Sequence, residues 1–274
     1  MKSVIDIGGM PVSNQHPMML FGGMNVLESR DLAFEIAAHY VDVCTRLNIP
    51  YVFKASFDKA NRTNIKGKRG VGIGPTLSDF ETIKEEFDVN TLTDVHNEGQ
   101  INLIKNVYNN SVDIIQIPAF LCRQTDLVRA AVETGKTVNI KKGQFLAPWD
   151  VKGILSKTEG AKEVWITERG TSFGYNNLVV DFNGIQYMLN NLDVPIVFDA
   201  THSCQQPGGL GTSSGGNRNN VAGLARAAAA VGVNNFFLEV HADPDNAPSD
   251  GPNMLHLTDF ERAVDEIHRY SYTG

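Results

Sequence analysis

Cysteine is scarce in this chain of 274 residues, which has only Cys44, Cys122 and Cys204. An odd number of cysteines without CxxC spacing argues against a disulfide framework and indicates a reducing compartment. Long apolar runs are missing too, so the sequence offers no segment that could span a membrane. Residues 1–15 lack the apolar core and cleavage site of a signal peptide. We therefore expect a cytoplasmic protein without a membrane partner.

Basic residues are also fewer than acidic ones. Lys and Arg number 24 against 31 Asp and Glu, which gives a formal net charge of -7. A nucleic-acid-binding protein is usually basic, so we expect no nucleic-acid partner. Neither the GxGxxG pattern nor a Walker A sequence is present, and a dinucleotide or nucleoside triphosphate site therefore has little support. An anionic small-molecule ligand would need its counter-charges gathered at one place in the fold.

A pattern of strand followed by helix repeats along the chain. After a short hairpin around Gly8-Gly9, the expected strands occupy residues 18–21, 51–55, 91–93, 112–117, 137–140, 163–167, 194–198 and 235–238. A helical pattern follows each strand; the helix expected over 30–47, for example, can be capped by Ser29. The last helix is expected to open with a capping box from Thr258 to Glu261.

These units of roughly thirty residues predict an α/β fold, a (β/α)8 TIM barrel. No linker-like stretch divides the chain, so we expect one domain over residues 1–274, with the hairpin in residues 1–14 as a cap. A doubly wound open sheet is the alternative. It usually has fewer strands, and its ligand site gathers at a single switch point.

Polar side chains stand at the ends of nearly all the expected strands. They are Asn25, Lys54, Ser56, Lys59, Asp94, His96, Gln116, Lys141, Arg169, Asp199, His202 and Glu239. In a barrel these positions converge on one mouth. Lysine and arginine side chains gathered there repel one another unless an anion arrives, and phosphate and carboxylate groups suit them. His202, Glu239 and Asp94 add groups that can transfer protons.

Two single motifs suggest other chemistry: a Schiff base at Lys141 stays open, whereas a nucleophile elbow at residues 211–215 is discounted. Lys141 could form a Schiff base, as in some barrel aldolases, although its neighbour Lys142 makes phosphate binding about as plausible. Residues 211–215 fit the GxSxG pattern, but no strand runs directly into them, as a nucleophile elbow requires. We expect a mobile lid over the site there.

Eight segments spread along nearly the whole chain carry a family resemblance. They are FGGMNVLESRD (21–31), YVFKASFDKANR (51–62), TDVH (93–96), IIQIPAFLCRQTDL (114–127), NIKKGQFLAPWD (139–150), TERGTSFGYNNLVVDF (167–182), FDATHS (198–203) and SDGP (249–252). In this order they resemble the 3-deoxy-D-manno-octulosonate 8-phosphate (KDO8P) synthase family. KASFDKANR and IPAFLCRQTDL favour it over the related heptulosonate and sialic-acid synthases.

The resemblance implies a transferase in lipopolysaccharide (KDO) biosynthesis. Phosphoenolpyruvate would condense with D-arabinose 5-phosphate and water to give 3-deoxy-D-manno-octulosonate 8-phosphate and inorganic phosphate. A 3-deoxy-D-arabino-heptulosonate 7-phosphate synthase that uses erythrose 4-phosphate is the nearest alternative. A barrel that binds phosphosugars without catalysis is another.

The resemblance also assigns substrate contacts, residue by residue. Phosphoenolpyruvate would be held by Lys54, Ser56, Lys59, Gln116, Lys141, Arg169 and the backbone near Ala119. The sugar would contact Asn61, Asp94 and Phe120. Arg62 and Thr63, the latter commonly serine in the family, match the position that grips the sugar phosphate from a neighbouring subunit. This implies a homotetramer.

A last group would consist of Asn25, His202, Glu239 and Asp250. In metal-dependent members these positions are ligands, with cysteine in place of Asn25. The sequence is mixed: Asn25 and DGP (250–252) match metal-independent members, whereas KKGQFLAPWD and DATHSCQQPGGLG match metal-dependent ones. A neutral amide cannot replace a thiolate as a strong soft ligand. We therefore expect no required metal or cofactor, although weak divalent metal at the other three residues stays open. Asn25 would hold the geometry, while His202 and Asp250 handle water or protons.

Overall fold

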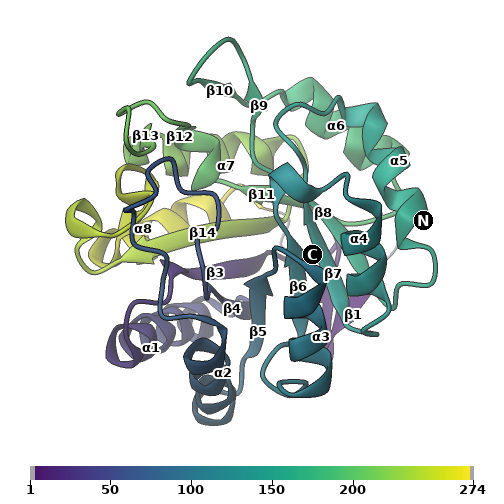
Figure 1. Ribbon diagram of the computed structural model, residues 1–274. Helices are drawn as coiled ribbons and strands as arrows, with labels where there is room; N and C mark the ends of the chain where they lie inside the picture. The colour runs from purple at the N-terminus through teal and green to yellow at the C-terminus, as the bar shows by residue number, and fades with distance from the viewer. Residues whose placement is uncertain (1–3, 272–274) are drawn as a thin grey trace.

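Eight parallel strands close into a barrel in the computed structural model, which describes residues 4–271 (Figure 1). The barrel strands are β3 (Met19–Val26), β4 (Tyr51–Ser56), β5 (Asn90–Asp94), β6 (Ile114–Ile117), β7 (Thr137–Lys141), β8 (Val164–Glu168), β11 (Ile196–Asp199) and β14 (Asn235–His241). Each pairs with the next in chain order, and the pairing of β14 with β3 closes the ring. The (β/α)8 prediction is thus confirmed, and closure rules out the open sheet.

Helices connect successive barrel strands and surround them. They are α1 (Arg30–Leu47), α2 (Ile73–Phe87), α3 (Glu98–Asn106), α4 (Thr125–Val132), α5 (Val151–Leu155), α6 (Phe182–Asn191), α7 (Val221–Ala230) and α8 (Leu257–His268). Ser29 caps α1 as expected, because its side chain accepts a hydrogen bond from the backbone N–H of Leu32. The expected capping box is wrong: Thr258 lies inside α8, and His256 is the N-cap.

The N-terminal hairpin closes the amino-terminal end of the barrel. Its strands β1 (Ile5–Ile7) and β2 (Met10–Val12) pair antiparallel. Apolar side chains of the hairpin and of the barrel interior form one buried cluster: Ile5, Ile7, Val12, Met19, Phe21, Val52, Leu92, Ile114, Trp165, Val197 and Phe237. The expected cap is confirmed over residues 4–14, while residues 1–3 lie outside the described part of the chain.

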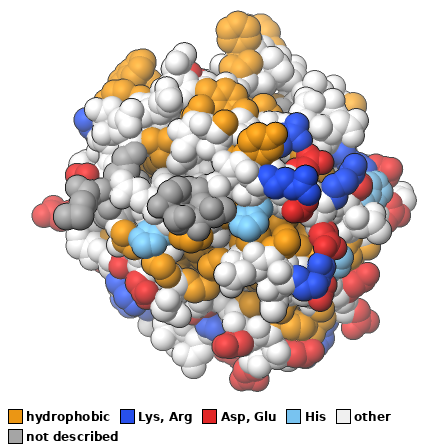
Figure 2. All heavy atoms as spheres, turned by 180° about the vertical axis from the view of Figure 1, so that it is seen from behind, with side chains coloured by type: hydrophobic (Ala, Val, Ile, Leu, Met, Phe, Trp, Pro, Cys, Tyr) orange, Lys and Arg blue, Asp and Glu red, His pale blue; other side chains and the backbone are white. Residues whose placement is uncertain are grey.

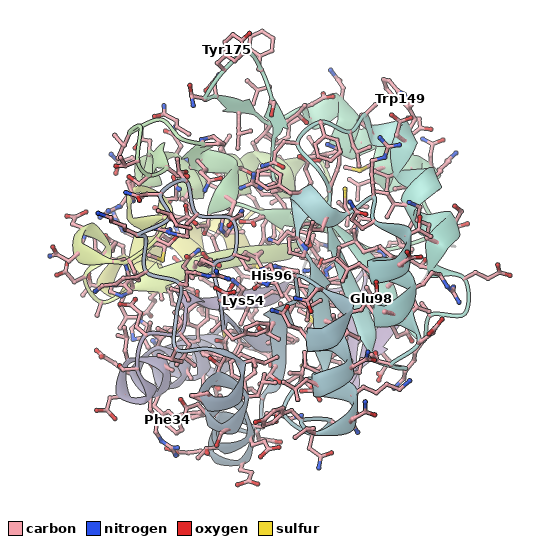
Figure 3. The ribbon with its side chains drawn as sticks, viewed as in Figure 1. Phe34, Lys54, His96, Glu98, Trp149 and Tyr175 are labelled. Carbon is pink, nitrogen blue, oxygen red and sulfur yellow. The ribbon has the colours of Figure 1, made fainter. Side chains whose placement is uncertain are left out.

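Long connections gather at the carboxyl-terminal end of the barrel. Strands β9 (Thr171–Ser172) and β10 (Leu178–Val179) form a projecting hairpin, and β12 (Gln205–Gln206) pairs with β13 (Gly215–Gly216) at the two ends of the glycine-rich loop (Figure 1). The short strand β15 (Leu255–His256) extends the sheet beside β14. Figure 3 shows Lys54 and His96 near the centre of the barrel and Tyr175 at its periphery, on the projecting hairpin.

The outer surface differs from this interior. On the reverse face, lysine and arginine side chains stand next to aspartate and glutamate rather than forming a continuous basic area (Figure 2). Between residues 4 and 271, no helix combines the length and apolar character needed to cross a bilayer. Lys54, Lys59, Lys141 and Arg169, in contrast, line one cavity at the barrel mouth.

Candidate active site

The period-two geometry of the strands decides which side chains enter the barrel. Apolar side chains that point into the barrel form one layer, which we call the apolar floor. It includes Val52, Leu92, Ile114, Val197 and Phe237. Two residues further along the same strands, buried polar side chains take their place: Lys54, Asp94, Gln116, Asp199 and Glu239. A polar layer therefore lies on the apolar floor, at the carboxyl ends of the strands.

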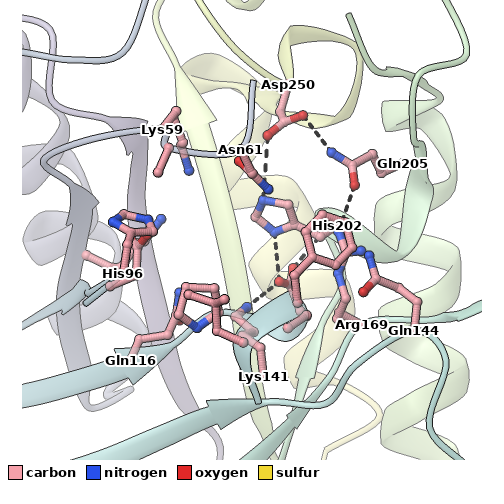
Figure 4. Close-up of a pocket in the computed structure, with 18 residues that line it drawn as sticks. Lys59, Asn61, His96, Gln116, Lys141, Gln144, Arg169, His202, Gln205 and Asp250 are labelled. Carbon is pink, nitrogen blue, oxygen red and sulfur yellow. Dashed lines mark hydrogen bonds and ion pairs between the residues drawn. The ribbon is translucent and has the colours of Figure 1, made fainter. Parts of the chain in front are cut away.

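A cavity of about 400 Å³ opens above this layer (Figure 4). The predicted site residues that line it are Lys54, Lys59, Asn61, Asp94, Gln116, Ala119, Phe120, Lys141, Arg169, His202 and Asp250. Asn25, Ser56 and Glu239 lie behind them and bond to lining side chains, as described below. The fold thus brings together side chains from segments far apart in the sequence, and most of the predicted set faces one volume.

Lys54 and Glu239 form a buried ion pair between β4 and β14, with 2.7 Å between Nζ and Oε1. Gly23 of β3 is in register with both residues. A Cβ at Gly23, where φ is +152°, would lie 2.3 Å from the carbonyl oxygen of Lys54, so the close approach requires glycine. Burial would lower the pKa of Lys54, but Glu239 and Asp94 raise it. Burial would raise the pKa of Glu239, but the charges of Lys54, His202 and Lys59 lower it to about 2.

Asp94 organises a second group of polar side chains. Its carboxylate accepts a hydrogen bond from the Ser56 hydroxyl and lies 3.2 Å from Nε2 of His96. Burial alone would raise the pKa of Asp94, but His96 and the charges of Lys54 and Lys59 hold it well below its usual range. Lys59 donates to the Ser56 hydroxyl over 3.0 Å. Asp94 is therefore an anion that orients neighbouring donors.

Lys141 and Arg169 are cations whose pKa values burial lowers, that of Lys141 to about 8. Lys141 forms an ion pair with Asp199 and lies 3.6 Å from the centroid of the Phe237 ring. Arg169 donates to Oε1 of Gln205 over 2.8 Å. Burial also lowers the pKa of Lys59. An incoming anion would offset this desolvation, which suits the cavity to phosphate and carboxylate groups.

Asn25 lies between two carboxylates. Its Nδ2 donates to Oε2 of Glu239 over 2.8 Å and to Oδ2 of Asp250 over 3.2 Å. Nε2 of His202 is 3.5 Å from the same Glu239 oxygen and 3.9 Å from the same Asp250 oxygen. Nε2 of Gln205 donates to the other Asp250 oxygen over 2.7 Å. The amide hydrogens of Asn25 and Gln205 thus donate to the carboxylates of Glu239 and Asp250, at the place where a cation could otherwise bind.

The donor set at Asn25 fits a strongly held transition metal poorly. The group that Asn25 turns towards Glu239 and Asp250 is an N–H donor, and its Oδ1 is buried without a hydrogen-bond partner. Among residues 4–271, no cluster of three or more His, Cys, Asp or Glu has the spacing of a metal site. His202, Glu239 and Asp250 are the residues that a weakly bound divalent ion would use.

Arg62 and Thr63 line a smaller cavity of about 60 Å³ beside the main one. Arg62 donates from Nη1 to the Ser249 hydroxyl over 2.5 Å and from Nη2 to the carbonyl of Pro248 over 2.7 Å. Asn61 and Asp250 line both cavities. Within one chain, Arg62 therefore lies beside the loop that carries Asp250, and its reach to a neighbouring subunit stays a prediction.

Two glutamines of the site were missed by sequence reasoning. Gln144 and Gln205 line the main cavity, and Gln205 connects Arg169 to Asp250 (Figure 4). Both lie in the connections that follow barrel strands, beyond the strand ends, where hydrophobic residues show no regular spacing. The family-like run 199–211 includes Gln205 and was the one sequence signal that could have identified it.

Comparisons with known proteins agree with this geometry. Residues 5–271 match the model of the DAHP synthetase I family. A relative from Rickettsia bellii (strain OSU 85-389), named 2-dehydro-3-deoxyphosphooctonate aldolase, is 51% identical over 272 residues, 98% of this chain and 97% of the relative. Relatives of the same name from Chelativorans sp. (strain BNC1) and Bartonella henselae are 52% identical over 255 residues and 48% identical over 273 residues. These alignments cover 92% and 99% of this chain, and 91% and 96% of the relatives.

Proposed function

The chain belongs to the DAHP synthetase I family, and from this premise we propose that it is a 3-deoxy-8-phosphooctulonate synthase. It condenses phosphoenolpyruvate with D-arabinose 5-phosphate and water, and it releases inorganic phosphate. The observation that carries the proposal is the cluster of Lys54, Lys59, Lys141 and Arg169 around one cavity, in a chain about half identical to these relatives over nearly its full length.

Phosphoenolpyruvate carries a phosphate and a carboxylate, and the cavity offers cations for each. We assign the phosphate to Lys141, Arg169 and the backbone near Ala119. The carboxylate end is assigned to Lys54, Ser56, Lys59 and Gln116. Since Lys54 is already paired with Glu239, the ammonium of Lys59 supplies the less compensated charge at that end.

The reaction needs carbon–carbon bond formation followed by loss of phosphate. C3 of phosphoenolpyruvate attacks the aldehyde carbon, water adds at C2, and the intermediate loses phosphate by C–O cleavage. His202 and Asp250 line the cavity, with Glu239 behind them, and this group can move protons to or from water and the sugar. Asn25 holds the two carboxylates in place through its amide hydrogens, and we propose that no metal is required.

The sugar extends from the main cavity towards the smaller one. Asn61 lines both volumes, and Asp94 and Phe120 line the main one. Arg62 and Thr63 bind the sugar phosphate, and in the proposed homotetramer they reach the site of a neighbouring subunit. We further propose that the chain folds as a single domain and works in the cytoplasm, in lipopolysaccharide biosynthesis.

The name of the matching family also favours a second candidate, a heptulosonate synthase that uses erythrose 4-phosphate. The test is phosphate release from phosphoenolpyruvate with either aldose phosphate, each with and without EDTA. We expect turnover with arabinose 5-phosphate that survives EDTA. Preference for erythrose 4-phosphate would establish the second candidate. If EDTA abolishes turnover and divalent metal restores it, only the proposed metal independence is refuted. If neither sugar gives turnover, both proposed enzyme activities are refuted.

A further inference from the structure

Asp199 is a buried carboxylate at the end of β11 on which three donors converge. Its Oδ1 accepts the backbone N–H of His202 over 2.9 Å. Its Oδ2 lies 2.7 Å from Nδ1 of the same imidazole and also pairs with the ammonium of Lys141. The side chain is fully excluded from solvent. A single carboxylate therefore contacts both a proposed phosphate-binding cation and a proposed proton-transfer group.

The chemistry of these contacts determines which ring nitrogen of His202 carries a proton. An ionised carboxylate only accepts hydrogen bonds, so Nδ1 of His202 must carry the proton that Asp199 receives. The Lys141 ammonium and the His202 backbone N–H also donate to this carboxylate, so all its close contacts are donors, as an ionised carboxylate requires. Nε2 is then the ring nitrogen left to face Glu239 and Asp250.

Lys141 is held from two sides. The Phe237 ring lies 3.6 Å from its ammonium and Asp199 pairs with it, which restricts where the charge can lie. The same aspartate thus sets the relative placement of the Lys141 ammonium and the His202 imidazole. Two groups that must act on one substrate gain from such a shared anchor, because small displacements of catalytic groups are costly in rate.

We propose that Asp199 is a positioning residue that holds His202 protonated at Nδ1, with Nε2 directed into the cavity, and anchors Lys141 beside it. This proposal rests on the synthase function proposed above, and it adds a residue that need not touch substrate itself. A side-chain amide at this position has one acceptor oxygen. It would have to point its NH2 group at either the His202 backbone N–H or the Lys141 ammonium, so Asp199→Asn disrupts the arrangement at nearly constant shape.

The first measurement needs no variant of Asp199. The protein is labelled with 15N-histidine, and the ring signals of His202 are assigned by their loss in His202→Gln. We expect the Nδ1 signal of the wild-type protein to have the chemical shift of a protonated nitrogen, whether or not Nε2 also carries a proton. A Nδ1 shift typical of an unprotonated nitrogen overturns the proposal. This readout does not depend on turnover, so failure of the proposed synthase activity would be recognised separately.

The second measurement is kinetic. We expect Asp199→Asn to lower kcat by about 100-fold or more, the scale of one lost proton-transfer group, and to raise KM for phosphoenolpyruvate through Lys141. Ser203→Ala is the matched control: it removes a 2.5 Å hydrogen bond to the backbone carbonyl of Asp199 and leaves the carboxylate in place. It should stay within a few-fold of wild type. A folded Asp199→Asn protein with kcat and KM near those of the control overturns the proposal.

Discussion

Replacing Lys54 by methionine should destabilise the protein strongly, because it leaves the Glu239 carboxylate buried without its cation. The two side chains are 2% and 0% exposed, so water cannot compensate the remaining charge. Removing one partner of a buried ion pair typically costs about 3–5 kcal/mol. Methionine has a similar length and fills the same space, so the loss of stability comes from the removed charge and not from a new cavity.

The pKa of Glu239 reflects this interaction together with the charges of His202 and Lys59. Its fall from 4.5 to about 2 corresponds to about 3 kcal/mol at 1.36 kcal/mol per pKa unit. Because the folded-state pKa is the lower one, this stability is present above pH 4.5 and is lost as the pH falls towards 2. In Lys54→Met the main lowering charge is gone, so the contribution of Glu239 to acid sensitivity should shrink.

Urea unfolding at neutral pH measures the free energy of unfolding of wild type, Lys54→Met, Glu239→Gln and the double variant. We expect the double variant to be more stable than the sum of the single losses predicts, since it no longer buries an unpaired charge. Arg46→Met, which breaks exposed ion pairs to Asp42 and Glu261, is the control and should change little. A Lys54→Met loss below about 1 kcal/mol, the range of an exposed pair, would refute the reasoning.

Three further predictions concern the site. Lys141→Ala should abolish phosphate release from phosphoenolpyruvate, because the pocket loses a phosphate counter-charge; near-normal turnover would contradict that role. Asn25→Cys should make activity sensitive to metal, and identical rates with added divalent ion and with chelator would count against the assignment of this position. Gly23→Ala should lower both kcat and the melting temperature, at a cost of about 2 kcal/mol, because the new Cβ meets the Lys54 carbonyl; an unchanged melting curve would show that the backbone adapts.

The barrel could be predicted because its signal is periodic. Strand-like runs recur with helical patterns between them. Along the strands, the residue of the polar layer follows the residue of the apolar floor by two positions. The ends of the expected strands placed Lys54, Asp94 and Glu239 at the barrel mouth from the sequence alone. The capping box at Thr258 was wrong because that motif is local and weak, and the start of α8 is set by β15 directly before it.

The pairings within the site could not be predicted in this way. Lys54 and Glu239 are 185 residues apart, and they meet because Gly23 of β3 lies in register between their strands. Gln144 and Gln205 belong to connections whose course follows no sequence period. The contact of Asp199 with both Lys141 and His202 likewise depends on side-chain directions across the barrel.

The sequence by itself determined the barrel, its cap and the inventory of charged groups at the mouth, because hydrophobic periodicity and strand ends are local properties of the chain. Only the tertiary structure decided which carboxylate neutralises which cation, and that Asn25 turns its amide hydrogens towards Glu239 and Asp250. The physical reason is that electrostatic partners are selected by distance and burial. In a closed barrel these are fixed by strand register, which joins residues from opposite ends of the chain.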